Sequence, residues 1–576
     1  MNTLVIVLIA AVCLFGAYML YGRWLANKWG IDPSAKTPAV VHEDGRDYVP
    51  TDGWTVFAHQ FSSIAGAGPV TGAIQAAAFG WLPVLLWVLL GGIFFGAVTD
   101  FGALYASVKN DGKSMGMLIE KYIGKTGRKL FLLFCWLFCG IVIAAFADMV
   151  AGTFNAFDAE GAPVEAAFTN GAAGMVSIMF MVFAVVFGFI QKKFNFSGWR
   201  EAVIGIVFIV LSFAVGMNCP LVFGKAAWSY ITFVYIFFAA VLPMWMLKQP
   251  RDYMTTFMFG AMIAGAVIGL LVAHPTMNLP VFTGFNNAKL GTMFPILFVT
   301  VACGAVSGFH SLVSSGTSSK TVENEKDMLK VGYGAMVLES LLAVLALCVA
   351  GAAAAADGTP ATGTPFQIFS RGVAGFFEMF GVPVSIATVF MTMCVSALAL
   401  TSLDAVARIG RMSFQELFSV DDMEHAEGWR KLCCNVYFST FITLVFGFIL
   451  TQIGYANIWP LFGSANQLLS ALVLATLCVF LKVTGRNNKM LFPPLVIMLC
   501  VTFTALVQRL IAMVKAISAA ASTAIPAGET TWGAVFIANG LQLILAVLLI
   551  VLGLNIVFHS VKSYTTCDAP EAKATV

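Results

Sequence analysis

Seven ionisable side chains lie inside or at the ends of long apolar runs, where a charge is expensive to place. They are His59, Asp100, Asp148, His310, Glu339, Asp404 and Arg509. A charged side chain at the centre of a membrane-spanning helix costs about 2.5–3.5 kcal/mol on insertion scales. Such residues therefore face the interior of a helix bundle, where they are paired or bind something. Carboxylates and imidazoles in that setting could take up and release protons.

Glu339 is favoured for proton handling, because it lies deep in its apolar run with no basic residue within helical reach. His310 and His59 are further candidates for that role. Simpler interpretations stay open for two of these groups. Asp100, near the end of its run, could reach the lipid headgroups, and a lone histidine such as His310 is often a hydrogen-bonded core residue.

A charged motif, KQPRDY, separates two apolar runs and contains Lys248, Arg251 and Asp252. These residues could form a solvated anchor that fixes topology, or a cytoplasmic gate in which a basic residue pairs with an acid elsewhere. Asp404 precedes Arg408 by four residues, which predicts a local ion pair on one helix face. The predicted gate or structural charges are Asp100, Arg251, Asp252, Asp404 and Arg408.

Helix-breaking residues interrupt the apolar run from Thr55 to Ala77, which carries Gly66, Gly68 and Pro69 in its middle. Proline lacks an amide hydrogen and clashes with the carbonyl four residues back, so the helix is expected to unwind here. Unwound backbone at bilayer depth is tolerated only where it lines a cavity or is buried in protein. There it frees carbonyls for cations and helix N-termini for anions.

A second unusual run, from Phe294 to Lys320, combines Gly304, Gly308 and Gly316 with many hydroxyl groups. Its hydroxyl residues are Ser307, Ser311, Ser314, Ser315, Thr317, Ser318 and Ser319, with His310 among them. The spacing of Gly304 and Gly308 also fits close helix packing through G-x-x-x-G contacts, and that alternative stays open.

The apolar runs indicate an all-α polytopic membrane protein. Of the 576 residues, 59% are hydrophobic and 11% are charged, against about 25% charged in soluble chains. Runs of about 20 apolar residues match the hydrocarbon core of a bilayer, where backbone amides must be satisfied within a helix. We predict about 15 spans, at residues 3–22, 55–80, 83–107, 130–151, 171–190, 201–217, 226–247, 254–273, 291–315, 331–356, 382–405, 435–453, 457–481, 490–514 and 532–560.

The basic residues orient these spans. The loops after odd-numbered spans, together with the C-terminus, hold 27 Lys and Arg residues, whereas the loops after even-numbered spans hold 4. Basic loops stay in the cytoplasm. The N-terminus is therefore predicted to be periplasmic and the C-terminus cytoplasmic. The first run is expected to be retained as a span, because no basic n-region precedes it.

Several function classes are disfavoured. The net charge of +3 is too small to argue for nucleic acid binding. The sequence holds no nucleophile elbow, no phosphate-binding loop with a lysine and no zinc-spaced cysteine cluster. No loop is long enough for a soluble domain. We therefore expect no enzyme activity, no cofactor and no metal beyond a possible Na⁺.

Five stretches, in order along the chain, carry a resemblance to a known family. They are SSIAGAGPVTGA (62–73), LPMWMLKQPRDYM (242–254), LFVTVACGAVSGFHSLVSSGTSSK (297–320), VGYGAMVLES (331–340) and ALTSLDAVARIGR (399–411). Together they resemble the carbon starvation protein A family, which includes bacterial peptide and pyruvate transporters. After about Glu416 the resemblance is weaker.

The resemblance implies a bacterial inner-membrane importer related to the amino acid–polyamine–organocation superfamily, with a LeuT-type core of five plus five inverted helices. Residues 1–54 would hold an extra helix and a cytoplasmic loop, and 55–415 the transporter core. Residues 416–564 would add C-terminal helices, and 565–576 a cytoplasmic tail. The span at 291–315 would be the eighth core helix.

From this we predict cation-coupled uptake of small organic acids or short peptides by alternating access during carbon starvation. Freed amides would hold a substrate carboxylate. Carbonyl and hydroxyl oxygens would suit Na⁺, whereas H⁺ would need a titratable group. The predicted substrate-binding residues are Gly66, Ala67, Gly68, Pro69, Thr71, Ser307 and His310. The predicted coupling residues are Ala65, Gly66, Ser314, Ser315, Thr317, Ser318, Glu339 and His59.

Two alternatives from other classes stay open: a membrane sensor of starvation, and a facilitative channel without ion coupling. The expected partners are membrane lipid and a small-molecule substrate. The sequence leaves the oligomeric state open.

Overall fold

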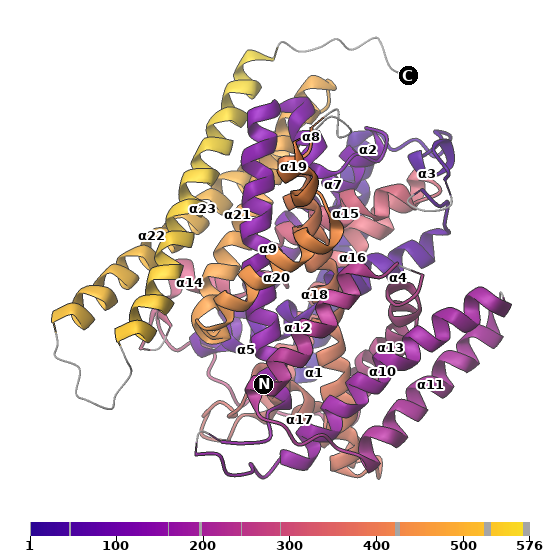
Figure 1. Cartoon of the computed structure of the whole chain (residues 1–576), viewed down its shortest axis with the longest axis vertical. Helices are drawn as coiled ribbons and strands as arrows, with labels where there is room; N and C mark the ends of the chain where they lie inside the picture. Colours follow the sequence, from indigo (N-terminus) through magenta and orange to yellow (C-terminus); the bar gives the residue numbers. More distant parts are fainter. Residues whose placement is uncertain are drawn as a thin grey trace.

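The computed structural model describes residues 2–44, 48–158, 160–194, 198–243, 245–288, 290–420, 427–522 and 532–567, with side chains at all of these except 520–522 and 532–537. The predicted C-terminal tail lies almost wholly outside the described residues. Within them the ribbon is nearly all helical (Figure 1), with one antiparallel pair of two-residue strands, β1 (Asn286–Asn287) and β2 (Gly291–Thr292).

The described residues of the first half of the chain form thirteen α-helices. They are α1 (Thr3–Ala17), α2 (Arg23–Trp29), α3 (Pro38–Val41), α4 (Gly53–Ile64), α5 (Ala67–Ala76), α6 (Trp81–Gly91), α7 (Ala97–Val108), α8 (Met115–Tyr122), α9 (Lys125–Phe154), α10 (Ala167–Phe194), α11 (Trp199–Asn218), α12 (Lys225–Val241) and α13 (Lys248–Ala273). Short 3-10 or π segments join some of them: η1 (Tyr18–Gly22), η2 (Ala77–Phe79) and η3 (Gly92–Gly96).

The second half follows the strands. Its α-helices are α14 (Met293–Thr300), α15 (Gly308–Gly316), α16 (Ala335–Ala353), α17 (Pro365–Glu378), α18 (Val384–Phe418), α19 (Gly428–Cys433), α20 (Val436–Thr451), α21 (Tyr455–Val483), α22 (Phe492–Ser522) and α23 (Trp532–Thr566). The short segments are η4 (Ser318–Lys320), η5 (Glu325–Asp327), η6 (Leu329–Gly334) and η7 (Lys489–Leu491).

Within the described residues, 11 helices are long and apolar enough to cross a membrane, by length and composition. Two shorter apolar helices, α12 and α20, accompany them. The prediction of a polytopic helical membrane protein is thereby confirmed.

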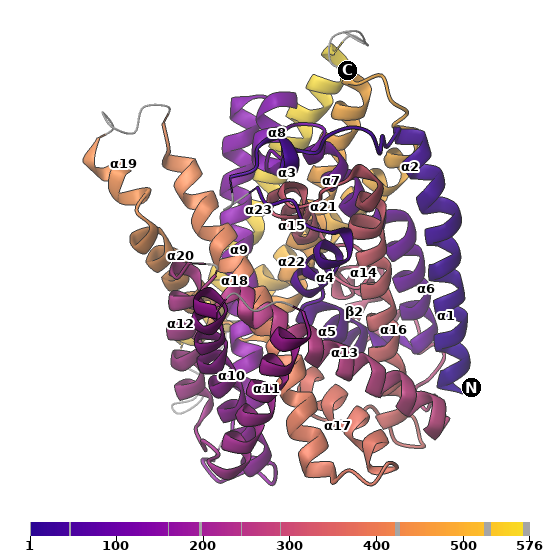
Figure 2. The ribbon, with the colours of Figure 1, turned by 90° about the vertical axis from the view of Figure 1, so that its right-hand side faces the viewer.

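The centre of the bundle is formed by α21 and α9, whose most apolar windows are 100% and 83% buried inside the protein. The corresponding windows of α11 and of the α1–α2 helix are only 17% and 28% buried. Figure 2 shows α1 along one edge of the bundle and the α10–α11 hairpin on the other side. Because a helix that is apolar all round must be covered by protein or by lipid, these outer helices face the lipid.

Two pairs of short helices, α4–α5 and α14–α15, run in opposite directions through the bundle. In Figure 2, α4 lies above α5, whereas α15 lies above α14. The chain just before α4 pairs with the chain just after α15, through a bridge between Thr51 and Val322. The start of one pair therefore lies beside the end of the other.

Candidate functional site

The first predicted break is present, between α4 and α5. Ala65 (φ −71°, ψ 66°) and Gly66 (φ −84°, ψ −155°) leave helical geometry. Pro69 lies four residues after Ala65, whose carbonyl its ring would strike in a continuous helix. The helix ends at Ile64 and restarts at Ala67, so the proline falls in the first turn of α5, where no amide donor is needed.

Glycines at this break let two other segments approach closely. A Cβ at Gly68 would lie 2.3 Å from the Sγ of Cys303, in the second break. A Cβ at Gly66 would lie 2.3 Å from the Oγ of Ser402, on α18. A side chain at Gly68 would therefore collide with Cys303, and one at Gly66 would displace the Ser402 hydroxyl.

A second break lies in the glycine- and serine-rich run and separates α14 from α15, where residues 301–307 are not helical. Asn466 of α21 supports it from the side. Its Oδ1 accepts a hydrogen bond from the amide of Phe309 at 3.1 Å. Its Nδ2 donates to Ser307 Oγ at 3.0 Å and to Cys303 Sγ at 3.4 Å. Since lipid offers no hydrogen-bond partners, unwound backbone at this depth needs such protein contacts.

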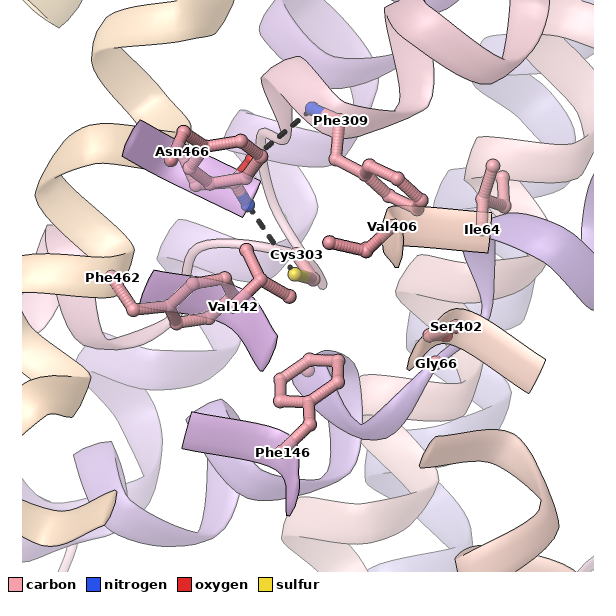
Figure 3. Close-up of a pocket in the computed structure, with 12 residues that line it drawn as sticks. Ile64, Gly66, Val142, Phe146, Cys303, Phe309, Ser402, Val406, Phe462 and Asn466 are labelled. Atoms are coloured by element: carbon pink, nitrogen blue, oxygen red, sulfur yellow. Dashed lines mark hydrogen bonds between the residues drawn. The ribbon is translucent and has the colours of Figure 1, made fainter. Parts of the chain in front are cut away.

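Both breaks meet at a small cavity, shown in Figure 3. It is lined by Ile64, Gly66, Gly68, Phe138, Val142, Phe146, Cys303, Phe309, Ser402, Val406, Phe462 and Asn466. The space open to the centre of a water molecule is about 10 Å³, which is room for about one water. The lining is mostly apolar and has no charged side chain among the described residues.

The polar groups of this cavity lie on two sides. Figure 3 shows Ser402 beside Gly66 on one side, with Asn466 and Cys303 across from them. The Ser402 hydroxyl is buried and makes no hydrogen bond to the described residues. A buried hydroxyl without a partner is costly, so Ser402 has hydrogen-bonding capacity left for a guest in the cavity.

Next to the cavity, an imidazole lies between two carboxylates. His310 follows the cavity residue Phe309, and its Nδ1 lies 3.1 Å from Asp100 Oδ2 in a hydrogen bond. On the other side, His310 Nε2 lies 3.3 Å from Glu339 Oε2. All three side chains are fully buried. Asp100 therefore does not reach the headgroups. His310 is not an isolated core histidine, because it lies between two carboxylates. We call these three residues the acid–histidine triad.

The triad is only partly hydrogen-bonded. The approach of His310 to Glu339 lacks hydrogen-bond geometry, and both carboxyl oxygens of Glu339 are buried without a hydrogen-bond partner among the described residues. Asp100 Oδ1 is likewise unpartnered. Buried polar groups are almost always satisfied in native proteins, so this arrangement marks a place where charge or protonation can change.

A second buried cluster surrounds Arg251 of α13, whose side chain is 1% exposed. Its Nη2 donates to Asp252 Oδ1 at 2.8 Å and to Asp404 Oδ2 at 3.1 Å. Its Nη1 donates to the hydroxyl of Tyr235 at 2.5 Å. The predicted local pair is also present, with Arg408 Nε donating to Asp404 Oδ1 at 3.0 Å. We call these five residues the arginine cluster. It joins α12, α13 and α18, and Arg251 is buried in it rather than solvated.

The remaining intramembrane charges are engaged elsewhere. Asp148 accepts from Lys225 Nζ at 2.7 Å and from the amide of Tyr455 at 2.8 Å. Arg509 donates to Gln542 Oε1 at 2.6 Å. These contacts tie α9 to α12 and α21, and α22 to α23.

Three of the four hydroxyl groups predicted to bind Na⁺ are already hydrogen-bonded within the protein. Gln60 Nε2 donates to Ser314 Oγ at 2.8 Å, and Ser318 Oγ donates to Gln60 Oε1 at 2.5 Å. Ser315 Oγ donates to the Ser311 carbonyl of its own helix, whereas Thr317 caps the C-terminus of α15 through its backbone amide and not through its hydroxyl. The bonds therefore tie the hydroxyls of Ser314, Ser315 and Ser318 to Gln60 and to α15 itself instead of to the freed carbonyls of the first break.

Two other predicted residues lie apart from the triad. His59 of α4 is half-buried, and the charges that act on it are those of Lys248 and Asp252. Thr71 is buried in α5 and donates to Met149 Sδ at 3.4 Å. The structure thus brings His310, Glu339 and Asp100 together, although Asp100 was expected with the gate charges.

Sequence reasoning missed Asn466, Ser402, Phe146 and Phe462. The pair Asn466–Gln467 inside an otherwise apolar run is a signal that could have been used, because buried amides in membrane helices need partners. Ser402 precedes Asp404 by two residues and carries no comparable signal. The two phenylalanines could not be told from ordinary core residues.

Two interrupted membrane helices that meet at a closed cavity beside buried ionisable groups are the features of a helical membrane transporter. A family model described as "Carbon starvation protein CstA" matches residues 2–363 and 350–505. The chain belongs to the carbon starvation protein CstA family, as its motifs predicted.

Curated relatives agree with this assignment. "Peptide transporter CstA" of Escherichia coli is 32% identical, over 87% of this chain and 80% of that protein. "Pyruvate/proton symporter BtsT" of the same organism is 36% identical over 58% of this chain and 47% of that protein. These relatives are named as transporters and not as enzymes. Among solved structures, the Eremococcus coleocola manganese transporter superposes with a TM-score of 0.49 at 10% identity, covering 90% of this chain and 99% of that one.

Proposed function

We propose that the protein imports a small carbon nutrient across the bacterial inner membrane, coupled to protons, by alternating access. A pyruvate-like organic acid is the substrate class that we favour. Short peptides are the second candidate, because several relatives are named peptide transporters. The proton is favoured over Na⁺ because one relative is named a proton symporter and because Gln60 occupies the hydroxyls of Ser314 and Ser318, two of the four proposed for a sodium site.

One observation carries this proposal: both helix breaks line the same small cavity, whose lining residues are buried. At its edge, α5 restarts at Ala67, so the amides of Ala67 and Gly68 lie at a positive helix end that favours an anion. The unpartnered hydroxyl of Ser402 can add a third donor. Phe146 and Phe462 supply an apolar wall for a short carbon chain. The donors suit the carboxylate of a small organic acid, and the apolar wall suits its short carbon chain.

The cavity must widen before it can hold a substrate, since its open space is about that of one water. We therefore assign this conformation to an occluded stage of the cycle. The arginine cluster would lock the cytoplasmic side and the Asp148–Lys225 contact the periplasmic side, in the orientation that the basic loops predict. The cycle would release these two contacts in turn.

The order of helices supports an inverted repeat whose division differs from the one expected. A broken helix, a long helix with a π segment, a short helix and a long helix recur twice, as α4–α9 and as α14–α18. On this basis the second repeat begins at α14, which makes α14–α15 the sixth core helix rather than the eighth. The core would then extend through α21. The fifteen membrane crossings predicted from the sequence would then be the 11 long helices, the shorter helices α12 and α20, and the broken pairs α4–α5 and α14–α15.

Transport by purified protein in liposomes tests the function. Labelled pyruvate and a labelled dipeptide are offered separately, with an inward proton gradient, an inward sodium gradient or no gradient. We expect accumulation of the organic acid above equilibrium only with the proton gradient. Equilibration without accumulation would identify a facilitator. Absence of flux for both compounds would favour a sensor, and accumulation with sodium alone would refute proton coupling.

A further inference from the structure

The acid–histidine triad has the geometry of a site that binds a single exchangeable proton. We propose that Glu339 carries the coupled proton, while Asp100 holds His310 as a fixed, charged neighbour. This assignment rests on the proposed function. It adds the proton-binding group, a positioning residue and a stoichiometry of one proton per substrate.

The first step is the difference between the two carboxylates. Asp100 has a hydrogen bond to His310 Nδ1 at 3.1 Å, whereas neither oxygen of Glu339 has a hydrogen-bond partner among the described residues. All three groups are fully buried. An ionised carboxylate in such surroundings is very costly unless it is paired and hydrogen-bonded, and a neutral acid costs far less. One imidazolium cannot balance two buried carboxylates, and Asp100 holds the hydrogen bond to it, so Glu339 is the group that carries the proton in this conformation.

The second step is the role of Asp100. A carboxylate that accepts from Nδ1–H fixes the ring orientation and directs Nε2 toward the opposite side. That opposite side is Glu339, 3.3 Å away. Asp100 and protonated His310 together are neutral, so the triad is neutral with one proton on Glu339. When Glu339 is opened to water and loses its proton, His310 provides the adjacent positive charge that keeps the anion tolerable.

The third step links the triad to the cavity. His310 directly follows Phe309, which lines the cavity and whose amide is held by Asn466. In the described residues the ionisable neighbour of Glu339 is His310, at 3.3 Å, with Asp100 on the other side of the imidazole at 3.1 Å. A rearrangement of 301–307 that admits substrate would also move His310 relative to Glu339.

The stoichiometry follows from one exchangeable group. A monocarboxylate that carries one negative charge would cross with one proton, so its uptake would be electroneutral. A zwitterionic dipeptide would cross with a net charge of +1. Because coupled groups titrate together, a titration cannot assign the proton to one of them. The quantity to measure is therefore the number of protons moved per substrate.

The experiment compares Glu339→Gln with Glu378→Gln, which makes the same change on an exposed carboxyl of α17. Both are tested in liposomes for accumulation driven by a proton gradient and for exchange of internal against external substrate. We expect Glu339→Gln to keep exchange at close to the wild-type rate and to lose gradient-driven accumulation at least tenfold. Glu378→Gln should keep both.

Three results would overturn the assignment. Wild-type accumulation by Glu339→Gln would show that the proton binds elsewhere. Loss of exchange as well, in a protein that stays monodisperse in detergent, would give Glu339 a structural or substrate-binding role. A measured ratio of two or more protons per substrate would exclude a single carrier. If the wild type itself shows no flux, it is the proposed function that fails, so the two failures are distinguishable.

Asp100→Asn tests the positioning role separately. Loss of the charge that holds His310 should shift the pH at which exchange and accumulation are half-maximal, while the substrate KM for exchange stays within about threefold. An unchanged pH profile would contradict the role given to Asp100, and so would a large change in KM alone. Asp100→Glu, which restores the charge, should recover part of the wild-type profile.

Discussion

The arginine cluster and the acid–histidine triad are both buried in the membrane bundle, yet their polar atoms are satisfied very differently. In the arginine cluster, Asp404 accepts from Arg251 and Arg408, and Arg251 also binds Asp252 and Tyr235. In the triad, only the bond between Asp100 and His310 is made, and both oxygens of Glu339 are left without one.

The difference separates two uses of buried charge. A saturated ion cluster is rigid, because removing any member leaves an uncompensated charge. It suits a contact that holds helices together. An unsaturated cluster can change its protonation at low cost to its neighbours, which suits coupling. The following predictions, ordered by the size of the expected effect, test this contrast.

Arg251→Met should have the largest effect on stability. It leaves two carboxylates short of a partner in a buried site, which costs about 3–5 kcal/mol. The midpoint of thermal unfolding in detergent should fall well below that of Arg371→Met, where the arginine is exposed on α17. Equal midpoints would mean that the arginine cluster is not rigid in solution, and the contrast with the triad would be lost.

Gly68→Val should abolish uptake by filling the junction of the two breaks. Its Cβ alone would lie 2.3 Å from Cys303 Sγ and 2.4 Å from Cys303 Cβ, and overpacking costs about 1–3 kcal/mol. The protein should still be inserted, because the arginine cluster is untouched. Gly152→Ala is the matched control, since its Cβ would meet nothing within 4 Å. Normal uptake by Gly68→Val would show that the first break is not part of the transport path.

Asn466→Leu should weaken the second break. It leaves the Phe309 amide and the Ser307 hydroxyl without their partner, at about 1–3 kcal/mol for an unsatisfied buried donor. We expect a raised KM or lost uptake with a modest fall in unfolding midpoint. Asn555→Ala, an exposed asparagine on α23, serves as the control. If Asn466→Leu transports normally, the break does not depend on α21.

Glu339→Gln should have the smallest effect on stability. A protonated carboxyl and an amide are both neutral and nearly the same shape, so the substitution removes no charge from the closed conformation. The free energy of unfolding should change by less than about 1 kcal/mol, although gradient-driven accumulation is lost. A fall as large as that of Arg251→Met would show that both clusters are structural, and would end the distinction between them.

Part of the site was predictable because its cause is local. Gly66, Gly68 and Pro69 break a helix wherever they occur in an apolar run, since proline cannot donate and its ring excludes a carbonyl. Glu339 stood out because no basic residue lies within helical reach of it. Such arguments use only neighbours in the chain, and they do not depend on how the bundle is packed.

The partners could not be predicted in the same way. Asp100 and His310 are 210 residues apart, and Gln60 and Ser314 are 254 apart. Asp100 was placed with the gate charges, and the serines of α15 with a sodium site, because a sequence does not say which faces of two distant helices meet. The same holds for Asn466 and Ser402, whose importance comes from the cavity that they line.

The sequence alone determined that this chain is a polytopic helical membrane protein of the carbon starvation family, and where its first helix breaks, because bilayer thickness and proline geometry act on local segments. Only the tertiary structure decided which breaks share a cavity and which buried acids are satisfied. Both depend on helix packing between residues hundreds of positions apart, and the hydrogen bonds that result have no counterpart in local sequence.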